Sequence, residues 1–255
     1  MLGNTDDPFA GLSAVLTAAP IQVDPHRQRR KGVPEVVYAA GKPPRLVLAA
    51  VRKLLEHQAR VLVSRASPEV FDLLQTDLEP DGGTVLRTPS GATLLVCRAD
   101  AAGVRENPPE TGGVVGLLTA GASDAPSADE AAWVAHEMGC RVVRADDVGV
   151  AGLHRLEAPL RTLRSEGADV VIVVAGMDGA LPSVVAGLVD VPVIGLPTSV
   201  GYGLGGGGVA ALLSMLQTCA PGLVVVNIDN GVGAGATAAL MANRVAAARA
   251  ADRRS

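Results

Sequence analysis

Three residues in the second half of the chain carry side chains that could work together in a reaction. Cys219 offers a thiol that becomes a strong nucleophile when it loses its proton, and His154 or Asp178 could accept that proton. Each residue also has a structural explanation, since most cysteines are buried and inert, a lone histidine is more often structural, and aspartate is favoured at helix N-caps. Cys219 lies at the end of a helical stretch, where the helix dipole disfavours a thiolate. From the residues alone, we favour a structural role for Cys219.

The elements that must position these residues follow a regular pattern from about residue 114 onward, where apolar β-rich runs alternate with stretches of helical spacing. The runs are 114–118, 142–144, 170–175, 193–196 and 224–228, and the helical stretches are 127–138, 156–166, 181–188, 209–216 and 234–251. Such alternation is typical of a parallel sheet covered by helices on both faces. We therefore expect an α/β protein, whose C-terminal three-layer α/β/α domain has a five-stranded parallel, flavodoxin-like sheet, with a smaller N-terminal α/β domain.

The loops that follow the strands are rich in glycine and in small polar or ionisable residues. In a parallel sheet the ligand lies beyond the carboxyl ends of the strands, so these loops should form one site. His154 follows a strand, and this position favours a catalytic role. The glycine-rich loop at 201–208 precedes a helix and could hold a phosphate through its backbone N–H groups, or it could be a lid or a packing loop.

A Pro/Glu/Gly-rich stretch at 106–113 divides the chain into two regions. We expect a ragged segment at 1–22, a small α/β domain at 23–105, a linker at 106–113 and the α/β/α domain at 114–255. In the small domain, the pattern predicts a helix at 46–57, a strand at 60–64, a helix that begins after Ser67, and strands at 85–87 and 93–97.

Composition narrows the class of protein. Hydrophobic residues make up 48% and charged residues 19%, as in a globular chain with a sizeable core, and the net charge of −4 gives no reason to expect a nucleic acid or an anionic membrane as a partner. The apolar runs are far shorter than the roughly 20 residues of a membrane span, and the N-terminus lacks the basic region of a signal peptide. Three widely spaced cysteines predict neither a disulfide framework nor a zinc site, so we expect a reduced, cytoplasmic protein.

Several motifs carry a resemblance to known families. The run G-A-S-D at 121–124, the pair His154-Arg155 and the segment 174–197 are similar to the aminoimidazole-ribonucleotide carboxylase/mutase family of purine synthesis. The chain resembles a sister family, LarB, more closely, and that resemblance covers nearly the whole chain from about residue 23 to 243. It rests on the segments 34–42, 60–67, 119–124, 197–203, 219–222 (C-A-P-G) and 227–231 (N-I-D-N-G).

The resemblance to LarB implies an activity. That family carboxylates C5 of the pyridinium ring of nicotinic acid adenine dinucleotide, with carbon dioxide or bicarbonate as co-substrate. It also hydrolyses the phosphoanhydride, giving pyridinium-3,5-biscarboxylic acid mononucleotide and AMP for nickel-pincer cofactor synthesis. Mg²⁺ is expected for the hydrolysis. The fold of the related carboxylases implies a homo-oligomer built from dimers, with an octamer as one option.

The resemblance also implies roles for residues of this chain. Cys219 becomes the nucleophile, Asp178 stands where the family usually has Glu and is the candidate acid/base, and His154 is a candidate for moving protons. It gives no metal ligands. The expected substrate-binding residues are Ser123, Asp124, Arg155, Gly176, Met177, Thr198, Ser199, Gly201, Tyr202, Gly203, Asn227, Asp229 and Asn230.

Two alternatives remain open at this stage. A true purine-pathway carboxylase would have the same fold, but Cys219 and the N-terminal region lie outside that family's pattern. A nucleotide-binding regulator that has lost its chemistry is the other, because Asp178 replaces the usual Glu. The segment before Val23 and the run Tyr38-Ala-Ala-Gly41, which replaces a G-E-G stretch, also depart from the LarB pattern.

Overall fold

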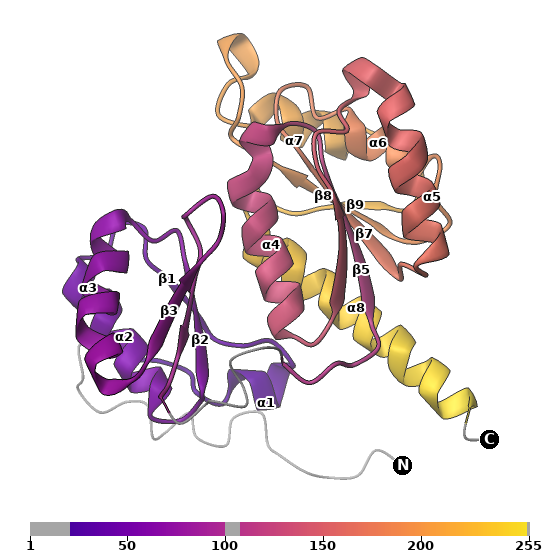
Figure 1. Cartoon of the computed structure of the whole chain (residues 1–255). Coiled ribbons are helices and arrows are strands. Elements are labelled where there is room, and N and C mark those ends of the chain that lie inside the picture. The colour runs from indigo at the N-terminus through magenta and orange to yellow at the C-terminus, as the bar shows by residue number, and fades with distance from the viewer. Residues whose placement is uncertain (1–20, 100–107, 254–255) are drawn as a thin grey trace.

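The computed structural model describes residues 21–99 and 108–253 of the chain. The expected ragged segment 1–22 therefore lies almost wholly outside the described residues, as does the start of the expected linker at 106–113. The described residues form two sheets, each with its own helices, and they stand side by side (Figure 1).

The larger sheet confirms the expected fold class. Its strands are β5 (Val114–Thr119), β6 (Arg141–Ala145), β7 (Val170–Ala175), β8 (Val193–Pro197) and β9 (Leu223–Val225). All of them run parallel in the order β6-β5-β7-β8-β9. The order reverses between β5 and β7, and a crevice for a ligand forms at such a switch point.

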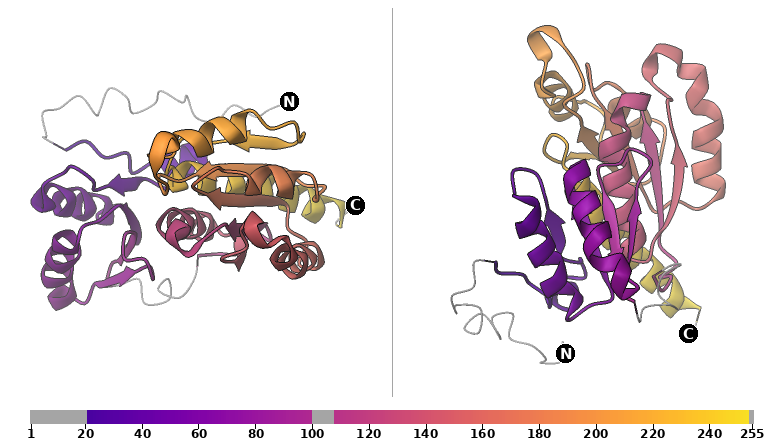
Figure 2. Two further views of the ribbon diagram at one scale, coloured as in Figure 1. Left: turned by 90° about the horizontal axis from the view of Figure 1, so that it is seen from above. Right: turned by 60° about the vertical axis from the view of Figure 1, so that its left-hand side comes forward.

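Helices cover both faces of this sheet, as the continuous apolar strands require (Figures 1 and 2). Buried residues of β7 alternate: Val170, Ile172 and Val174 share a core with α4 and α8, while Val171 and Val173 share another with the helices opposite. The helices are α4 (Ala125–Glu137), α5 (Glu157–Ser165), α6 (Leu181–Ala186), α7 (Val209–Leu216) and α8 (Gly231–Asp252), with short 3₁₀ turns η3 (Ala122–Asp124), η4 (Val150–Leu156) and η5 (Gly203–Gly205).

The smaller sheet belongs to the N-terminal domain. Its strands have the order β1-β2-β4-β3, in which β1 pairs with β2 in parallel and the other pairs are antiparallel. They are β1 (Val36–Tyr38), β2 (Arg60–Ser64), β3 (Thr84–Arg87) and β4 (Leu94–Cys97), and the helices are α1 (Arg27–Lys31), α2 (Pro44–Leu55), α3 (Pro68–Leu78) and the turn η2 (Glu79–Asp81). Ser67 caps α3 by accepting a hydrogen bond from the Val70 amide, as its position predicts.

The two domains share a core and polar contacts. Leu62 and Leu95 of the small sheet are buried in the same cluster as α4 and α8, while the opposite face of that sheet packs on α2 and α3. Arg60 donates two hydrogen bonds to the carboxylate of Glu137 on α4, one of them 2.7 Å long. The N-terminal domain therefore has a fixed position beside α4. Within the described residues, no helix has the length and apolar character that crossing a membrane requires.

Candidate active site

The loops after β5, β6 and β7 meet at the carboxyl edge of the large sheet and enclose a pocket of about 550 Å³, which we call the edge pocket. Its lining includes Ser123, Asp124, Arg155, Gly176, Met177 and Asp178. These residues come from three loops that are distant in the sequence. The parallel topology brings them together, because the carboxyl ends of neighbouring strands lie at one edge.

Asp124 fixes the wall of this pocket. Its buried carboxylate accepts hydrogen bonds from the Thr198 hydroxyl at 2.7 Å and from the Gly121 amide at 2.9 Å, so it ties the loop after β5 to the loop after β8. Burial raises the pKa of Asp124 above its ordinary value, and the hydrogen bonds from Thr198 and the backbone offset part of that rise. Two residues of the predicted binding set, Asp124 and Thr198, are thus in direct contact.

Met177 and Asp178 are held by a tight turn after β7. The Met177 amide donates to the Val200 carbonyl at 2.7 Å, and Met177 adopts a left-handed backbone conformation with φ of 54°. A Cβ on Gly176 would collide with that same Val200 oxygen, so only glycine fits there. The exposed Asp178 carboxylate accepts a 3.3 Å hydrogen bond from the Ala180 amide, just before α6. None of the described residues forms an ion pair with it, which leaves it available for proton transfer.

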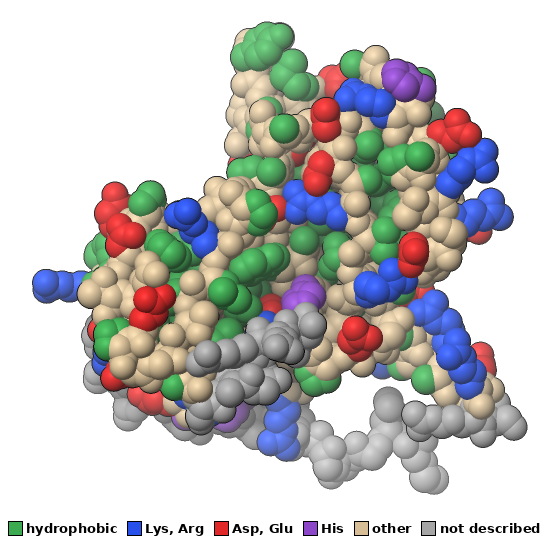
Figure 3. Space-filling model, viewed as in Figure 1, with side chains coloured by type: hydrophobic (Ala, Val, Ile, Leu, Met, Phe, Trp, Pro, Cys, Tyr) green, Lys and Arg blue, Asp and Glu red, His purple; other side chains and the backbone are tan. Residues whose placement is uncertain are grey.

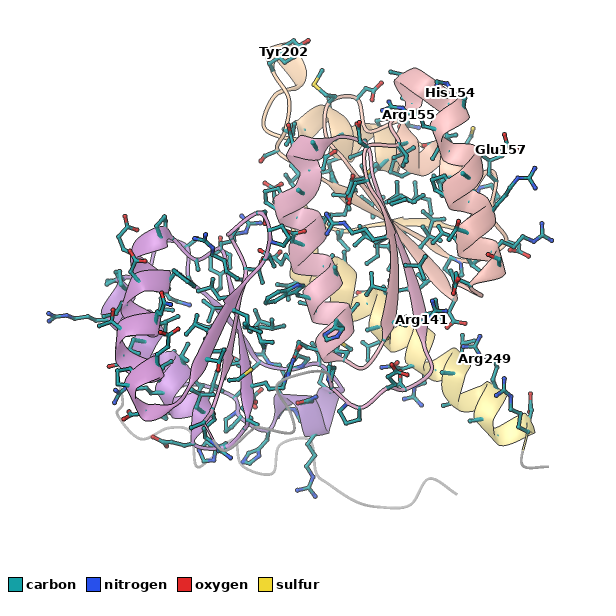
Figure 4. The ribbon with its side chains drawn as sticks, viewed as in Figure 1. Arg141, His154, Arg155, Glu157, Tyr202 and Arg249 are labelled. Atoms are coloured by element: carbon teal, nitrogen blue, oxygen red, sulfur yellow. The ribbon has the colours of Figure 1, made fainter. Side chains whose placement is uncertain are left out.

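His154 and Arg155 are adjacent on η4 but have different surroundings. Arg155 lines the edge pocket, and its guanidinium donates to the Asp147 carbonyl at 2.8 Å and lies 3.2 Å from the Asp147 carboxylate. His154 is exposed on the outer side of η4, away from the strand ends (Figure 4). The structure therefore places Arg155 in the pocket and His154 outside it within one chain.

A second pocket, of about 210 Å³, lies between the two domains, and we call it the interdomain pocket. Ser123 and Val200 line both pockets. Thr198 lines the interdomain pocket and donates its hydroxyl to Asp124 of the edge pocket. Ser199 and Asp229 of the predicted set line it. Its other polar residues were not predicted from the sequence, because they come from the N-terminal domain and from α4, and not from the loops after the strands of the large sheet: Arg65, Thr93, Ser127 and Glu130.

The glycine-rich loop stands apart from both pockets. Tyr202 is 82% exposed at the tip of this loop, which projects from the domain (Figure 4), and Gly201 and Gly203 lie beside it. They therefore do not line either pocket in a single chain. Asn227 and Asn230 have local roles at the start of α8: the Asn227 side chain accepts from the next backbone amide, and Asn230 caps the helix through the Gly233 amide at 2.8 Å.

Cys219 lies at the opposite edge of the sheet from these pockets. It precedes β9, and the nearby Gly222 carbonyl accepts a hydrogen bond from Val193 at the beginning of β8. Cys219 is exposed, whereas Cys97 and Cys140 are buried, and burial raises the pKa of the Cys140 thiol to about 11. One chain thus brings Asp178 and Arg155 together but leaves its only exposed cysteine away from them.

A third hollow, of about 580 Å³, lies between the small sheet and α4 on the face shown in Figure 3. Trp133 lines it with several basic side chains. Those cations already have carboxylate partners, since Arg144 lies 2.6 Å from Asp129 and Arg60 pairs with Glu137. We assign no ligand to this hollow. In the described part of the chain, no group of three or more His, Cys, Asp or Glu side chains is placed to hold a metal ion.

Comparison with known proteins agrees with this architecture. Residues 114–255 match the model of the AIR carboxylase family, and residues 17–81 match a LarB/PurE-like N-terminal domain. An uncharacterized protein of Methanocaldococcus jannaschii is 42% identical over 224 residues, which cover 87% of this chain and 84% of that protein. The N5-carboxyaminoimidazole ribonucleotide mutase of the same organism is 33% identical over 132 residues, 51% of this chain and 77% of that enzyme.

Proposed function

The chain belongs to the AIR carboxylase family and has a LarB/PurE-like N-terminal domain, and from this membership we propose that it carboxylates C5 of the pyridinium ring of nicotinic acid adenine dinucleotide. The dinucleotide is then hydrolysed at its phosphoanhydride, giving pyridinium-3,5-biscarboxylic acid mononucleotide and AMP. Family membership indicates carboxyl transfer, and Cys219 supports the more specific reaction. It is the exposed member of the three cysteines and begins the LarB-like run C-A-P-G.

The chemistry requires a nucleophile and a base. A pyridinium ring is electron-poor and does not attack carbon dioxide, but addition of the Cys219 thiolate to a ring carbon converts it to an enamine with a nucleophilic C5. C5 then forms a bond to carbon dioxide. Loss of the C5 proton to Asp178, followed by expulsion of the thiolate, restores the aromatic ring. The edge pocket offers Arg155 as a cationic partner for a carboxylate or phosphate of the substrate.

Mg²⁺ and the hydrolytic step are a separate part of the proposal. Since no cluster of three metal-ligating side chains is found among the described residues, we propose no protein-held metal centre. Mg²⁺ keeps several waters and is often bound by substrate phosphates with one or two carboxylates. We therefore expect it as a counter-ion of the pyrophosphate.

The position of Cys219 supports a site that is shared between two copies of the chain. A thiol at the amino end of β9 cannot reach the edge pocket at the carboxyl end of the same sheet, so we propose that the edge pocket receives Cys219 from another subunit. An exposed apolar surface around it supports assembly: Val209, Leu213 and Leu216 recur along α7, and Val224 is 49% exposed on the edge strand β9. This accords with the expected homo-oligomer.

The first experiment is mass spectrometry of pure protein incubated with nicotinic acid adenine dinucleotide, bicarbonate and Mg²⁺. We expect a mononucleotide that has gained one carboxylate, together with AMP, and we expect both to be lost in Cys219→Ala. The buried Cys97→Ala variant is the matched control and should keep turnover. An unchanged dinucleotide would contradict the proposal. Aminoimidazole ribonucleotide is then the next substrate to test, because of the similarity to the mutase.

The second experiment tests whether the site is shared between subunits. Cys219→Ala is expected to be inactive, and Asp178→Asn is expected to retain about a hundredth of wild-type turnover or less. If the two residues meet across an interface, co-expressed and doubly tagged mixed oligomers should regain turnover. The expected level is about half of wild type for a dimer, in which one of the two shared sites is intact, and about a quarter for random assembly in a larger oligomer. Mixed oligomers that stay inactive would place both residues in one subunit's site.

A further inference from the structure

The interdomain pocket contains a buried hydroxyl without a partner. Thr93 is 2% exposed, it lines this pocket, and its Oγ1 makes no hydrogen bond in the described structure. A buried hydroxyl without a hydrogen-bond partner is destabilising, and such groups are rare in native proteins. A ligand that supplies a donor or an acceptor in this pocket would satisfy Thr93.

Asp229 contributes a carboxylate to the lining of the interdomain pocket. The Asp229 carboxylate accepts from the Ser199 amide at 2.9 Å and from the Ser127 hydroxyl at 3.3 Å, both through Oδ1. Its Oδ2 takes no hydrogen bond from the described residues. Asp229 also holds a left-handed backbone conformation with φ of 54°, which fixes its direction. A carboxylate with a free oxygen among hydroxyls is suited to the vicinal hydroxyls of a ribose, because an acidic side chain is a recurrent partner of ribose hydroxyls.

The N-terminal domain contributes a cation at the rim. Arg65 lines the pocket, and its guanidinium donates to the Asp229 carbonyl, which joins the domains at this point. Arg65 lies directly after β2 with φ of 52°, an unusual conformation for this residue type. Its Cζ also lies 5.6 Å from the centre of the half-exposed Tyr38 ring. The guanidinium is thus held in place, and it retains N–H groups that could bind a phosphate.

We infer that the interdomain pocket binds a nucleoside monophosphate unit, with its ribose hydroxyls on Asp229 and Thr93 and its phosphate on Arg65. The inference rests on the proposed function in one respect: a dinucleotide occupying the edge pocket must place its second nucleotide in an adjoining site. The two pockets meet at Ser123 and Val200. The N-terminal domain then holds the nucleotide that leaves as AMP.

Calorimetric titration of the full-length protein with AMP tests the inference. We expect Thr93→Val to bind AMP several-fold more weakly while its melting temperature stays at or above the wild-type value, because the isosteric methyl group removes an unpaired hydroxyl. Arg65→Asn keeps a residue that tolerates positive φ and should weaken AMP binding about tenfold. Arg52→Gln is the matched control, because Arg52 is an exposed arginine of the same domain, paired with Asp77 and outside the pocket. It should leave AMP affinity unchanged.

The outcomes separate this inference from the proposed function. Absence of AMP binding to the wild-type protein at millimolar concentration would overturn the inference, as would equal affinities for wild type, Thr93→Val and Arg65→Asn. AMP binding that both variants weaken would uphold it, even if nicotinic acid adenine dinucleotide were not carboxylated.

Discussion

At the residue scale, a substitution of Asp178 should change the rate of catalysis without changing the stability of the fold. Its carboxylate makes one hydrogen bond in the described structure, with the Ala180 amide, and an asparagine oxygen can keep it. We expect Asp178→Asn to lower kcat by about 10²–10⁴-fold, the usual contribution of a general base, with an unchanged melting temperature. Asp178→Glu should retain turnover, because it restores the longer side chain of the LarB pattern. A wild-type kcat in Asp178→Asn would remove this residue from the mechanism.

The edge pocket could be predicted from the sequence because its residues lie in the loops that follow parallel strands. Asp124, Arg155 and Asp178 lie there for that reason. The rule says nothing about contributions from another domain, so it did not place Arg65 or Thr93 at the site, although Arg65 lies in the LarB-like segment 60–67. The same rule favoured a catalytic role for His154, which lies beside Arg155 in the loop after β6 but faces outward. The expected role of Cys219 came from resemblance alone, and its place in the fold raises the question of a second subunit.

At the element scale, the contact between α4 and α8 depends on small residues. A Cβ on Gly235 of α8 would collide with the Ala131 carbonyl oxygen and lie 3.0 Å from the Val134 Cβ on α4. Backbone cannot yield as a side chain can, so we expect Gly235→Ala to destabilise the protein by about 1–3 kcal/mol. Gly187→Ala is the control, because its nearest neighbour would lie at 3.5 Å and its φ is −78°. Urea denaturation should show a loss for Gly235→Ala alone, and equal stabilities would contradict this packing.

The limits of the central strands in the large sheet were easier to predict from the sequence than those of β1 in the small sheet, because the central strands are buried along their whole length. A strand buried on both faces, such as β7, has a continuous apolar run, so its limits at 170–175 follow from the sequence. Strand β1 has three residues with one buried, and no pattern marks it. The expected strand at 224–228 ends at Val225, because the residues after it turn into the cap of α8.

At the scale of the whole molecule, the position of the N-terminal domain decides whether the interdomain pocket exists. The pair of Arg60 and Glu137 joins the two domains, and their side chains are only 10% and 7% exposed. Burial by itself would raise the pKa of Glu137, but the hydrogen bonds from Arg60 and His136 outweigh it and hold that pKa below its usual value. A carboxylate with a lowered folded-state pKa stabilises the protein above its unfolded pKa, and this contribution disappears as the pH falls through the folded pKa.

Glu137→Gln should therefore destabilise the protein in a pH-dependent way. At pH 7 we expect a loss of about 3 kcal/mol, because the variant removes the carboxylate that pairs with the Arg60 guanidinium, whose side chain is only 10% exposed. The unfolded reference value is 4.5, so the difference from wild type should remain from pH 7 to about 4.5 and shrink at lower pH. The control is Glu166→Gln, since Glu166 pairs with Arg141 at an exposed site and should change stability by less than about 1 kcal/mol. Urea denaturation across this pH range measures both variants. A pH-independent loss in Glu137→Gln would mean that packing, and not the charge pair, fixes the domains, whereas a loss that disappears in acid would assign the domain contact to this ion pair.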